Sequence, residues 1–213
     1  MPDDRAQDLQ LMAELVAGRE SALDSLMARW EGPLRSFAHR YLQNSADTDE
    51  VVEETFVRIY HRRQDFAPGS NFSAWIFTIA ANLCRHRLRW RRRHPSESLD
   101  APADATSDRG PAIVLPARGA DPAGTAEQEE RIAALRVAVG QLPHEQRSAF
   151  LLHAYDALSY REIAEILGCS ERGVETLLYR ARQTLRGKLT SLFADRVPCL
   201  APSVLGAAKV LAH

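Results

Sequence analysis

The residues whose types and spacing could do chemistry are cations with aromatic neighbours. Between positions 82 and 94 the sequence has six arginines and no acid, and Trp75, Phe77 and Trp90 lie before and within this run. Guanidinium groups bind phosphates, and aromatic rings stack on unpaired bases, so the combination favours binding of single-stranded DNA. Two alternatives stay open: Trp75 and Phe77 have a spacing that also suits a protein core, and the arginines could form a solvated face.

A second group of candidates lies between Ser159 and Arg186, where the pattern predicts a helix-turn-helix. A capping box begins at Ser159, and Gly168 supplies a tight turn after the first helix. Small or apolar residues such as Ala164 and Val174 would pack between the two helices. The residues that follow the turn and would meet DNA are Arg172, Thr176, Leu177, Arg180 and Arg182. An ordinary helical hairpin is the alternative.

The elements that position both groups are predicted to be helices. Apolar residues recur at spacings of three and four in residues 9–27, 47–60 and 72–90, which is typical of amphipathic helices. In the second half, 127–140 predicts a helix and Pro143 opens another. No segment alternates as a strand would. The predicted fold class is all-α, with two small helical domains joined by a flexible linker and a helix-turn-helix in the second.

Charge is unevenly distributed, although 27 Lys and Arg nearly balance 28 Asp and Glu. Residues 1–54 have a net charge of −7 and residues 95–130 one of −6, whereas 171–196 has +3. The acidic stretch is rich in proline and alanine and cannot bury enough apolar surface to offset its ordering entropy, which predicts a linker. The predicted organisation is a first domain at 1–94, the linker at 95–126, a second domain at 127–193 and a tail at 194–213.

The remaining composition excludes several classes of protein. The three cysteines, Cys84, Cys169 and Cys199, are far apart and form neither a disulfide framework nor a metal clip. No signal peptide, membrane span, phosphate-binding glycine loop or catalytic triad is evident. We therefore expect a cytoplasmic, non-catalytic protein without metal or cofactor. A zinc- or redox-sensing role for Cys84 with His86, or for Cys169, stays open beside buried structural cysteine.

Three ordered blocks of the chain resemble the extracytoplasmic-function (ECF) sigma factors, small bacterial transcription initiation factors. Residues 46–66 (ADTDEVVEETFVRIYHRRQDF) are similar to the segment with which the family binds core RNA polymerase. Residues 71–94 (NFSAWIFTIAANLCRHRLRWRRRH) resemble its promoter-melting and −10-reading segment, and residues 141–189 resemble its −35-reading domain. The resemblance, over about 9–94 and 127–190, implies a sigma factor that directs core polymerase to promoters.

The resemblance also implies roles for individual residues. Phe66 and Asn82 fall where family members form a pocket for a flipped −10 base, and Trp75 falls on a supporting tryptophan. A preformed pocket helps because unstacking a base costs a few kcal/mol. The residues implied to hold the melted strand are Arg85, Arg89 and Arg92. The residues on the implied polymerase-docking helix are Asp49, Glu50, Glu53 and Phe56.

The recognition helix departs from the family pattern at two positions. Glu175 and Leu177 stand where basic residues are common, which removes two contacts; Glu175 could accept from a cytosine amine, and Leu177 could contact a thymine methyl. Thr176 and Arg180 match. The acidic linker would suit the polymerase RNA channel in which the family's linker lies, or would be a passive tether.

The implied partners are core RNA polymerase, promoter DNA and a cognate anti-sigma factor. We expect no membrane insertion and a monomer when the chain is free of partners. The rival interpretation is a stand-alone helix-turn-helix regulator, which would bind its duplex site tightly without polymerase.

Overall fold

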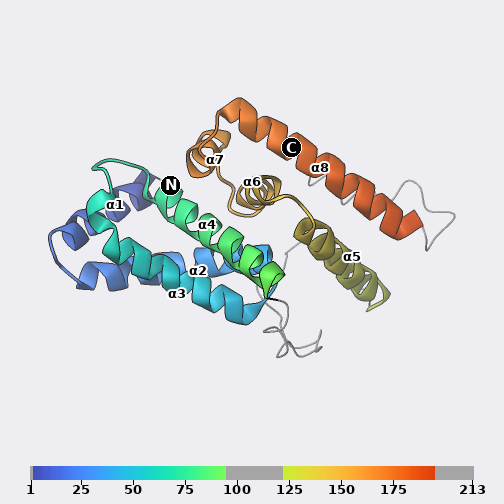
Figure 1. The fold of residues 1–213 in the computed structure, drawn as a ribbon, viewed down its shortest axis with the longest axis horizontal. Helices are drawn as coiled ribbons and strands as arrows, with labels where there is room; N and C mark the ends of the chain where they lie inside the picture. Colours follow the sequence, from blue (N-terminus) through green and yellow to red (C-terminus); the bar gives the residue numbers. More distant parts are fainter. Residues whose placement is uncertain (1, 95–121, 195–213) are drawn as a thin grey trace.

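Helices make up the whole regular structure of the described residues. The computed structural model describes residues 2–94 and 122–194, and in these ranges the all-α prediction is confirmed. The helices are α1 (Pro2–Val16), α2 (Ser21–Leu42), α3 (Ser45–His61), the 3-10 helix η1 (Arg63–Asp65), α4 (Phe72–Arg93), α5 (Pro122–Gly140), α6 (His144–Ala154), α7 (Tyr160–Leu167) and α8 (Glu171–Ala194). Figure 1 shows α1–α4 as one group and α5–α8 as another.

An aromatic cluster between α2 and α4 holds the first group together. The ring of Trp30 lies 5.7 Å from Phe72 and 6.0 Å from Phe77, both edge to face, and Phe37 lies 5.4 Å from Phe77. These are favoured geometries for aromatic pairs. Phe77 is only 2% exposed, so the core alternative for this residue is confirmed.

The α4 helix has a buried half followed by a cationic half, as the sequence predicts. It begins where the side chain of Asn71 accepts hydrogen bonds from the backbone amides of Ser73 and Ala74, which caps the helix. Its apolar residues up to Cys84 pack in the core. The helix continues to Arg93 and thus holds the whole arginine run on one rigid element.

The second group contains the predicted helix-turn-helix. The hydroxyl of Ser159 and the carboxylate of Glu162 complete the capping box of α7, and Gly168 ends this helix with a φ of 65°. Ser170 caps α8 by accepting from the amide of Gly173 at 3.1 Å. The inner stripe of α8 is no more than 1% exposed and consists of Val174, Leu178, Ala181 and Leu185.

One predicted boundary differs from the structure. The helix expected at 127–140 begins five residues earlier, because α5 includes 122–126, which we assigned to the linker. Pro122 suits the first position of a helix, and alanines favour its first turns. The rest of the predicted linker, 95–121, and the tail, 195–213, lie outside the described residues.

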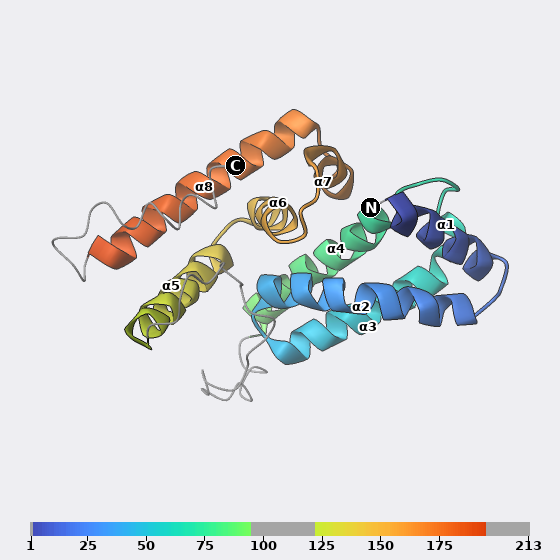
Figure 2. The same cartoon turned by 180° about the vertical axis from the view of Figure 1, so that it is seen from behind.

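The two helical groups contact each other. Helix α7 packs on α4, and α6 and α5 pack on α2. Figures 1 and 2 show α6 and α7 lying between α4 and α8. Residues far apart in the sequence are thereby brought close to the arginine run.

Candidate nucleic-acid interface

The arginine run of α4 is divided between two faces. Arg87 and Arg91 turn toward α3, where they donate to the carboxylate of Asp47 at 2.6 and 2.9 Å, and Arg87 also pairs with Glu50 at 2.8 Å. Asp47 is only 5% exposed. These two arginines therefore serve the packing of α4 on α3. Sequence reasoning missed this pairing because the acids lie some 40 positions upstream.

The other arginines that we predicted to hold DNA face solvent. Arg85, Arg89 and Arg92 are exposed and lie one or two turns apart on the same face of α4. The guanidinium of Arg85 donates to the side-chain oxygen of Asn82 at 3.0 Å, and Asn82 is also exposed. The residues implied by the family resemblance thus form one accessible polar surface.

Phe66 and Trp75 lie together at one end of this surface. Their ring centroids are 5.2 Å apart, and both rings contact Phe72. Phe66 is 8% exposed, whereas Trp75 is half-buried, so a base could reach the tryptophan more readily than the phenylalanine. Asn82 lies seven positions, or about two helical turns, beyond Trp75.

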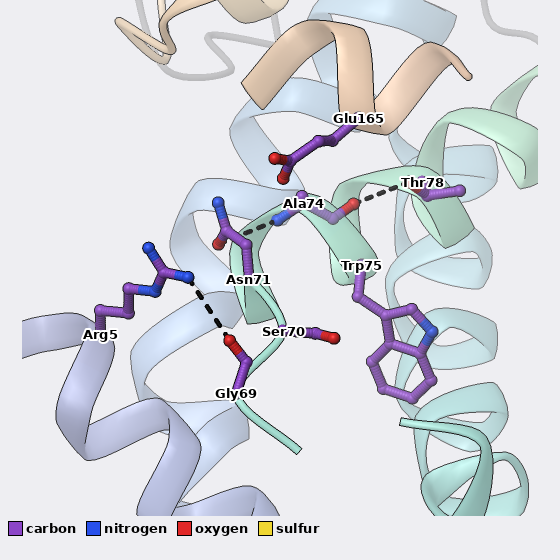
Figure 3. Close-up of a pocket in the computed structure, with 8 residues that line it drawn as sticks. All are labelled: Arg5, Gly69, Ser70, Asn71, Ala74, Trp75, Thr78 and Glu165. Atoms are coloured by element: carbon purple, nitrogen blue, oxygen red, sulfur yellow. Dashed lines mark hydrogen bonds between the residues drawn. The ribbon is translucent and has the colours of Figure 1, made fainter. Parts of the chain in front are cut away.

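A pocket of about 430 Å³ opens beside Trp75 (Figure 3). It is lined by the start of α4, by Arg5 of α1 and by Glu165 of α7. Neither Phe66 nor Asn82 is among the residues that line it. No sequence signal pointed to Arg5 or Glu165, because one is an isolated cation and the other comes from the second helical group.

The recognition helix α8 presents a mixed surface. Arg172, Thr176 and Arg180 are exposed, as predicted from the helix-turn-helix pattern. Leu177 and Arg182 are half-buried, and Leu177 packs against the core, which limits its reach toward a thymine methyl. The pattern missed Tyr179, which is 63% exposed on this helix.

The α3 surface predicted to bind polymerase is acidic and partly paired. Glu50 and Glu53 are exposed, but Glu50 also pairs with Arg87 of α4, and Asp49 pairs with Arg35 of α2. Phe56, however, is 4% exposed and belongs to the core, so its ring does not present the apolar contact area that we expected. The accessible apolar side chain beside it is Val57, which is 47% exposed.

A polar contact joins the two helical groups at α2 and α6. The hydroxyl of Tyr41 bonds to Nδ1 of His144, and the guanidinium of Arg147 donates to the carbonyl of Tyr41 at 3.2 Å. Burial, together with the charges of Arg85 and Arg147, lowers the pKa of His144 to about 4. The imidazole is therefore neutral at physiological pH.

We expect this histidine to make stability depend on pH. The folded protein keeps His144 neutral down to about pH 4, whereas the unfolded chain binds a proton near the ordinary pKa of 6.5. The contribution of neutral His144 to the free energy of unfolding is complete above pH 6.5. As the pH falls toward 4, about 1–2 kcal/mol of this free energy is lost, after allowance for partial solvent screening. Urea titrations across this range should show it.

The control for this prediction is His144→Asn, which keeps a hydrogen-bonding group near Nδ1 but does not titrate. The comparison is needed because burial raises the pKa of Asp156 to about 7, which acts in the opposite direction. The difference in unfolding free energy between the parent protein and His144→Asn should become smaller as the pH falls. A constant difference would show that His144 does not titrate in this way.

The described residues contain neither a metal-binding cluster nor a membrane-spanning helix. No cluster of three His, Cys, Asp or Glu side chains able to hold a metal ion occurs there. No helix in these ranges is long and apolar enough to cross a membrane. Cys84 is fully buried, and Cys169 is exposed at the turn before α8.

An arginine-lined helix beside aromatic rings, followed by a helix-turn-helix, defines a nucleic-acid-binding protein. The Sigma-70 region 2 family matches residues 26–94, and the Sigma-70, region 4 family matches residues 132–185. The chain is 30% identical to the ECF RNA polymerase sigma-E factor of Escherichia coli strain K12 over 186 residues, 87% of this chain and 95% of that protein. The chain belongs to the ECF RNA polymerase sigma factors.

Other known proteins support the same assignment. The RNA polymerase sigma-H factor of Pseudomonas aeruginosa is 26% identical over 189 residues, 89% of this chain and 97% of that protein. The solved structure of CnrH in complex with the cytosolic domain of CnrY is similar, with a TM-score of 0.62 and 28% identity over 90% of this chain and 99% of that chain. The stand-alone regulator is not favoured, because both sigma regions match.

A third likeness concerns the fold alone. The sigma factor RpoE of Bartonella quintana, solved in complex with the anti-sigma factor NepR, has a TM-score of 0.56 at 24% identity. The match covers 78% of this chain and 96% of that chain. The two proteins thus share the helical architecture although their sequences are only 24% identical.

Proposed function

We propose that this sigma factor directs core RNA polymerase to specific promoters by reading −35 duplex with α8 and melted −10 DNA with α4. The observation that carries the proposal is that one chain presents both an exposed arginine face beside Trp75 and a helix-turn-helix. Bond formation belongs to the polymerase, so the chain itself is not an enzyme. It acts where the polymerase acts, in the cytoplasm, with functional domains at 1–94 and 127–193.

At the −10 element the chain supplies binding and positioning. Arg85, Arg89 and Arg92 would neutralise phosphates of the melted strand, and the half-buried ring of Trp75 would stack on an unpaired base. Asn82 offers an amide that can read the edge of a flipped base. The guanidinium of Arg85 orients this amide by donating to its oxygen at 3.0 Å. Capturing a single strand in this way favours the open state of the duplex.

The largest expected −10 effect is that of Asn82→Ala. We expect open-complex formation to fall about tenfold, the equivalent of a hydrogen bond to a flipped base in a partly dry site, with polymerase binding unchanged. Permanganate footprinting measures the bubble, and holoenzyme assembly measures binding. Gln10→Ala removes an exposed amide from α1 and serves as the control. Normal bubbles with Asn82→Ala would exclude the base-reading role.

Two protein partners follow from the family and from the α3 surface. Glu50 and Glu53 are exposed beside Val57, which gives an acidic face with some apolar area for a basic segment of the polymerase. Similar proteins have been solved in complex with an anti-sigma factor or with another protein's cytosolic domain. We expect this chain to bind core polymerase and a cognate anti-sigma factor, and to be a monomer without them.

In vitro transcription with core polymerase on a promoter library tests the function directly. We expect specific transcripts only when the chain and the core enzyme are both present. Gel-shift titration of the isolated chain on the selected promoters is the companion measurement. Tight, specific duplex binding without polymerase, together with no transcription, would overturn the proposal.

A further inference from the structure

Trp90 is the one tryptophan whose ring lies outside the core of the described residues. Trp30 and Trp75 both pack against that core, and Trp30 also donates from its indole nitrogen to Asp8 at 3.1 Å. Trp90 is half-buried near the end of α4, within the arginine run. A large aromatic side chain stabilises a fold chiefly by the area that it buries. Packing therefore does not account for a tryptophan at this position.

Two side chains of the first helical group surround the ring of Trp90. The guanidinium carbon of Arg87 lies over the ring, 5.0 Å from its centroid, and the imidazole of His94 is stacked on it with centroids 4.9 Å apart. Arg87 is held independently of the tryptophan by its ion pairs with Asp47 and Glu50. This fixed cation keeps the indole ring oriented by a cation–π contact.

His94 shows which kind of group the ring of Trp90 accepts. Imidazole is a planar heteroaromatic ring, as the nucleobases are, and it lies at an angle of 28° to the indole. His94 is exposed at the C-cap of α4, where its backbone N–H and its Nδ1 both donate to the carbonyl of Trp90, at 3.0 and 3.1 Å. A single exposed hydrogen bond holds this side chain, so a base can replace the imidazole at low cost.

An exposed polar strip leads from the proposed base reader to Trp90. Four exposed residues follow one another at spacings of four, three and four, which places them on one side of α4. They are Asn82, His86, Arg89 and Arg93. Trp90 lies at the edge of this side, one turn after His86. A strand that runs from Asn82 along these polar groups therefore reaches Trp90.

Trp90 faces away from the second helical group. Burial and then the charge of Arg85 lower the pKa of His144 in α6, so Arg85 lies on the side of α4 that is nearest α6. Trp90 follows five positions later, which turns it about 140° around the helix axis. Within the part of the chain that the structure describes, its ring contacts are those with Arg87 and His94.

The separation along α4 determines which nucleotide would reach Trp90. Asn82 and Trp90 are eight positions apart, which is about 12 Å along the helix axis. At about 3.4 Å per nucleotide in a stacked strand, this length corresponds to about three to four nucleotides. The two side chains therefore contact different bases of the same strand.

We propose that Trp90 is a second stacking platform for the melted strand and binds an unpaired base about three to four nucleotides from the base that Asn82 reads. The base replaces the imidazole of His94 on the indole ring. Stacking tolerates any base, so Trp90 adds affinity and fixes the register of the strand without reading its sequence. The proposal rests on the proposed function of α4, because the melted strand must run along this helix.

A fluorescent base placed at one position of the melted strand at a time tests the contact. Holoenzyme made from core polymerase and the full chain is bound to a pre-melted fragment of the selected promoter that carries 2-aminopurine, whose fluorescence is quenched by stacking on indole. We expect one position, about three to four nucleotides from the base assigned to Asn82, to be quenched with the parent chain and to recover its fluorescence with Trp90→Ala.

The affinity of the same fragment gives a second measurement. Trp90→Ala should weaken binding about tenfold, and Trp90→Phe, which keeps a stacking ring, should retain most of the affinity. The slope of log affinity against log salt should not change in either variant, because indole neutralises no phosphate. A tryptophan that only positioned neighbouring arginines would lower this slope when it is removed.

Two matched variants separate stacking from damage to α4. His94→Ala frees the ring of Trp90 from its competing imidazole and should strengthen binding severalfold. Leu88 packs against the core two positions before Trp90, so Leu88→Ala loosens the helix without removing a stacking ring and should leave the quenched position unchanged. Urea denaturation followed by circular dichroism should show a smaller loss of stability for Trp90→Ala than for Leu88→Ala.

Three results would overturn the proposal. The first is that no position of the strand has quenching that depends on Trp90. The second is a loss of affinity with His94→Ala as large as that with Trp90→Ala, and the third is a lower salt slope with Trp90→Ala. A parent holoenzyme that did not bind the fragment would overturn the proposed function as well, so the two failures are distinguished.

Discussion

Asp47→Ala is expected to destabilise the first helical group by about 3 kcal/mol, because it removes the carboxylate on which two arginines depend. The Asp47 side chain is 7% exposed and accepts from Arg87 at 2.6 Å and from Arg91 at 2.9 Å. The side chains of Arg87 and Arg91 are 28% and 30% exposed, so water can still solvate their guanidinium groups when Asp47 is removed. The expected loss of stability is therefore at the low end of the range for a broken buried ion pair. Urea denaturation, followed by circular dichroism, measures the loss.

Asp49→Ala is the matched control on the same helix. Its carboxylate pairs with Arg35 at the surface, where side-chain exposures are 50% and 44%, so its removal should cost less than about 1 kcal/mol. Asp47→Asn should fall between the two, since it keeps the volume and one acceptor but loses the charge. If Asp47→Ala and Asp49→Ala cost the same, the ion pairs would not hold α4 on α3.

Local patterns along the sequence predicted the helices well because their causes are local. The capping box at Ser159, the turn at Gly168 and the inner stripe from Val174 to Leu185 depend on residues within a few positions of each other. The long α4 helix was predictable for the same reason. Its boundaries differ by only a few residues from the expected 72–90.

What the sequence did not reveal depends on contacts between distant segments. The run of arginines looked uniformly free of acids, yet Asp47 on a neighbouring helix pairs with two of them. The stripe on α3 suggested that Phe56 faces a partner, but packing against the core decides its exposure. Docking of α7 on α4, which brings Glu165 to the pocket beside Trp75, has no signal in either segment alone.

The division of the arginine run also changes how the net charge is understood. The formal charge of −1 is the sum of nearly equal numbers of cations and acids, and only part of the arginine run of α4 is available to DNA. Because Arg87 and Arg91 are paired, the predicted −10 surface depends on Arg85, Arg89 and Arg92. We therefore expect the exposed residues of α8 to contribute much of the specificity for a promoter.

Replacing both Arg172 and Arg180 by alanine is expected to reduce −35-dependent transcription about a hundredfold or more. Both side chains are exposed on α8, and each base or phosphate contact by arginine contributes about 1–3 kcal/mol. If both contact phosphates, the slope of log affinity against log salt should fall by about 1.8. A smaller change in slope with relaxed base preference would identify one of them as a base reader.

The measurement is holoenzyme binding and transcription on a promoter selected from a library, with and without its −35 element. The double variant should lose the advantage that the −35 element gives and keep its residual activity on the template that lacks the element. Arg19→Ala, which removes a 65% exposed arginine from the first helical group, should change neither. Equal losses on both templates would show that α8 does not read the −35 element, since a −35 contact can matter only where the element is present.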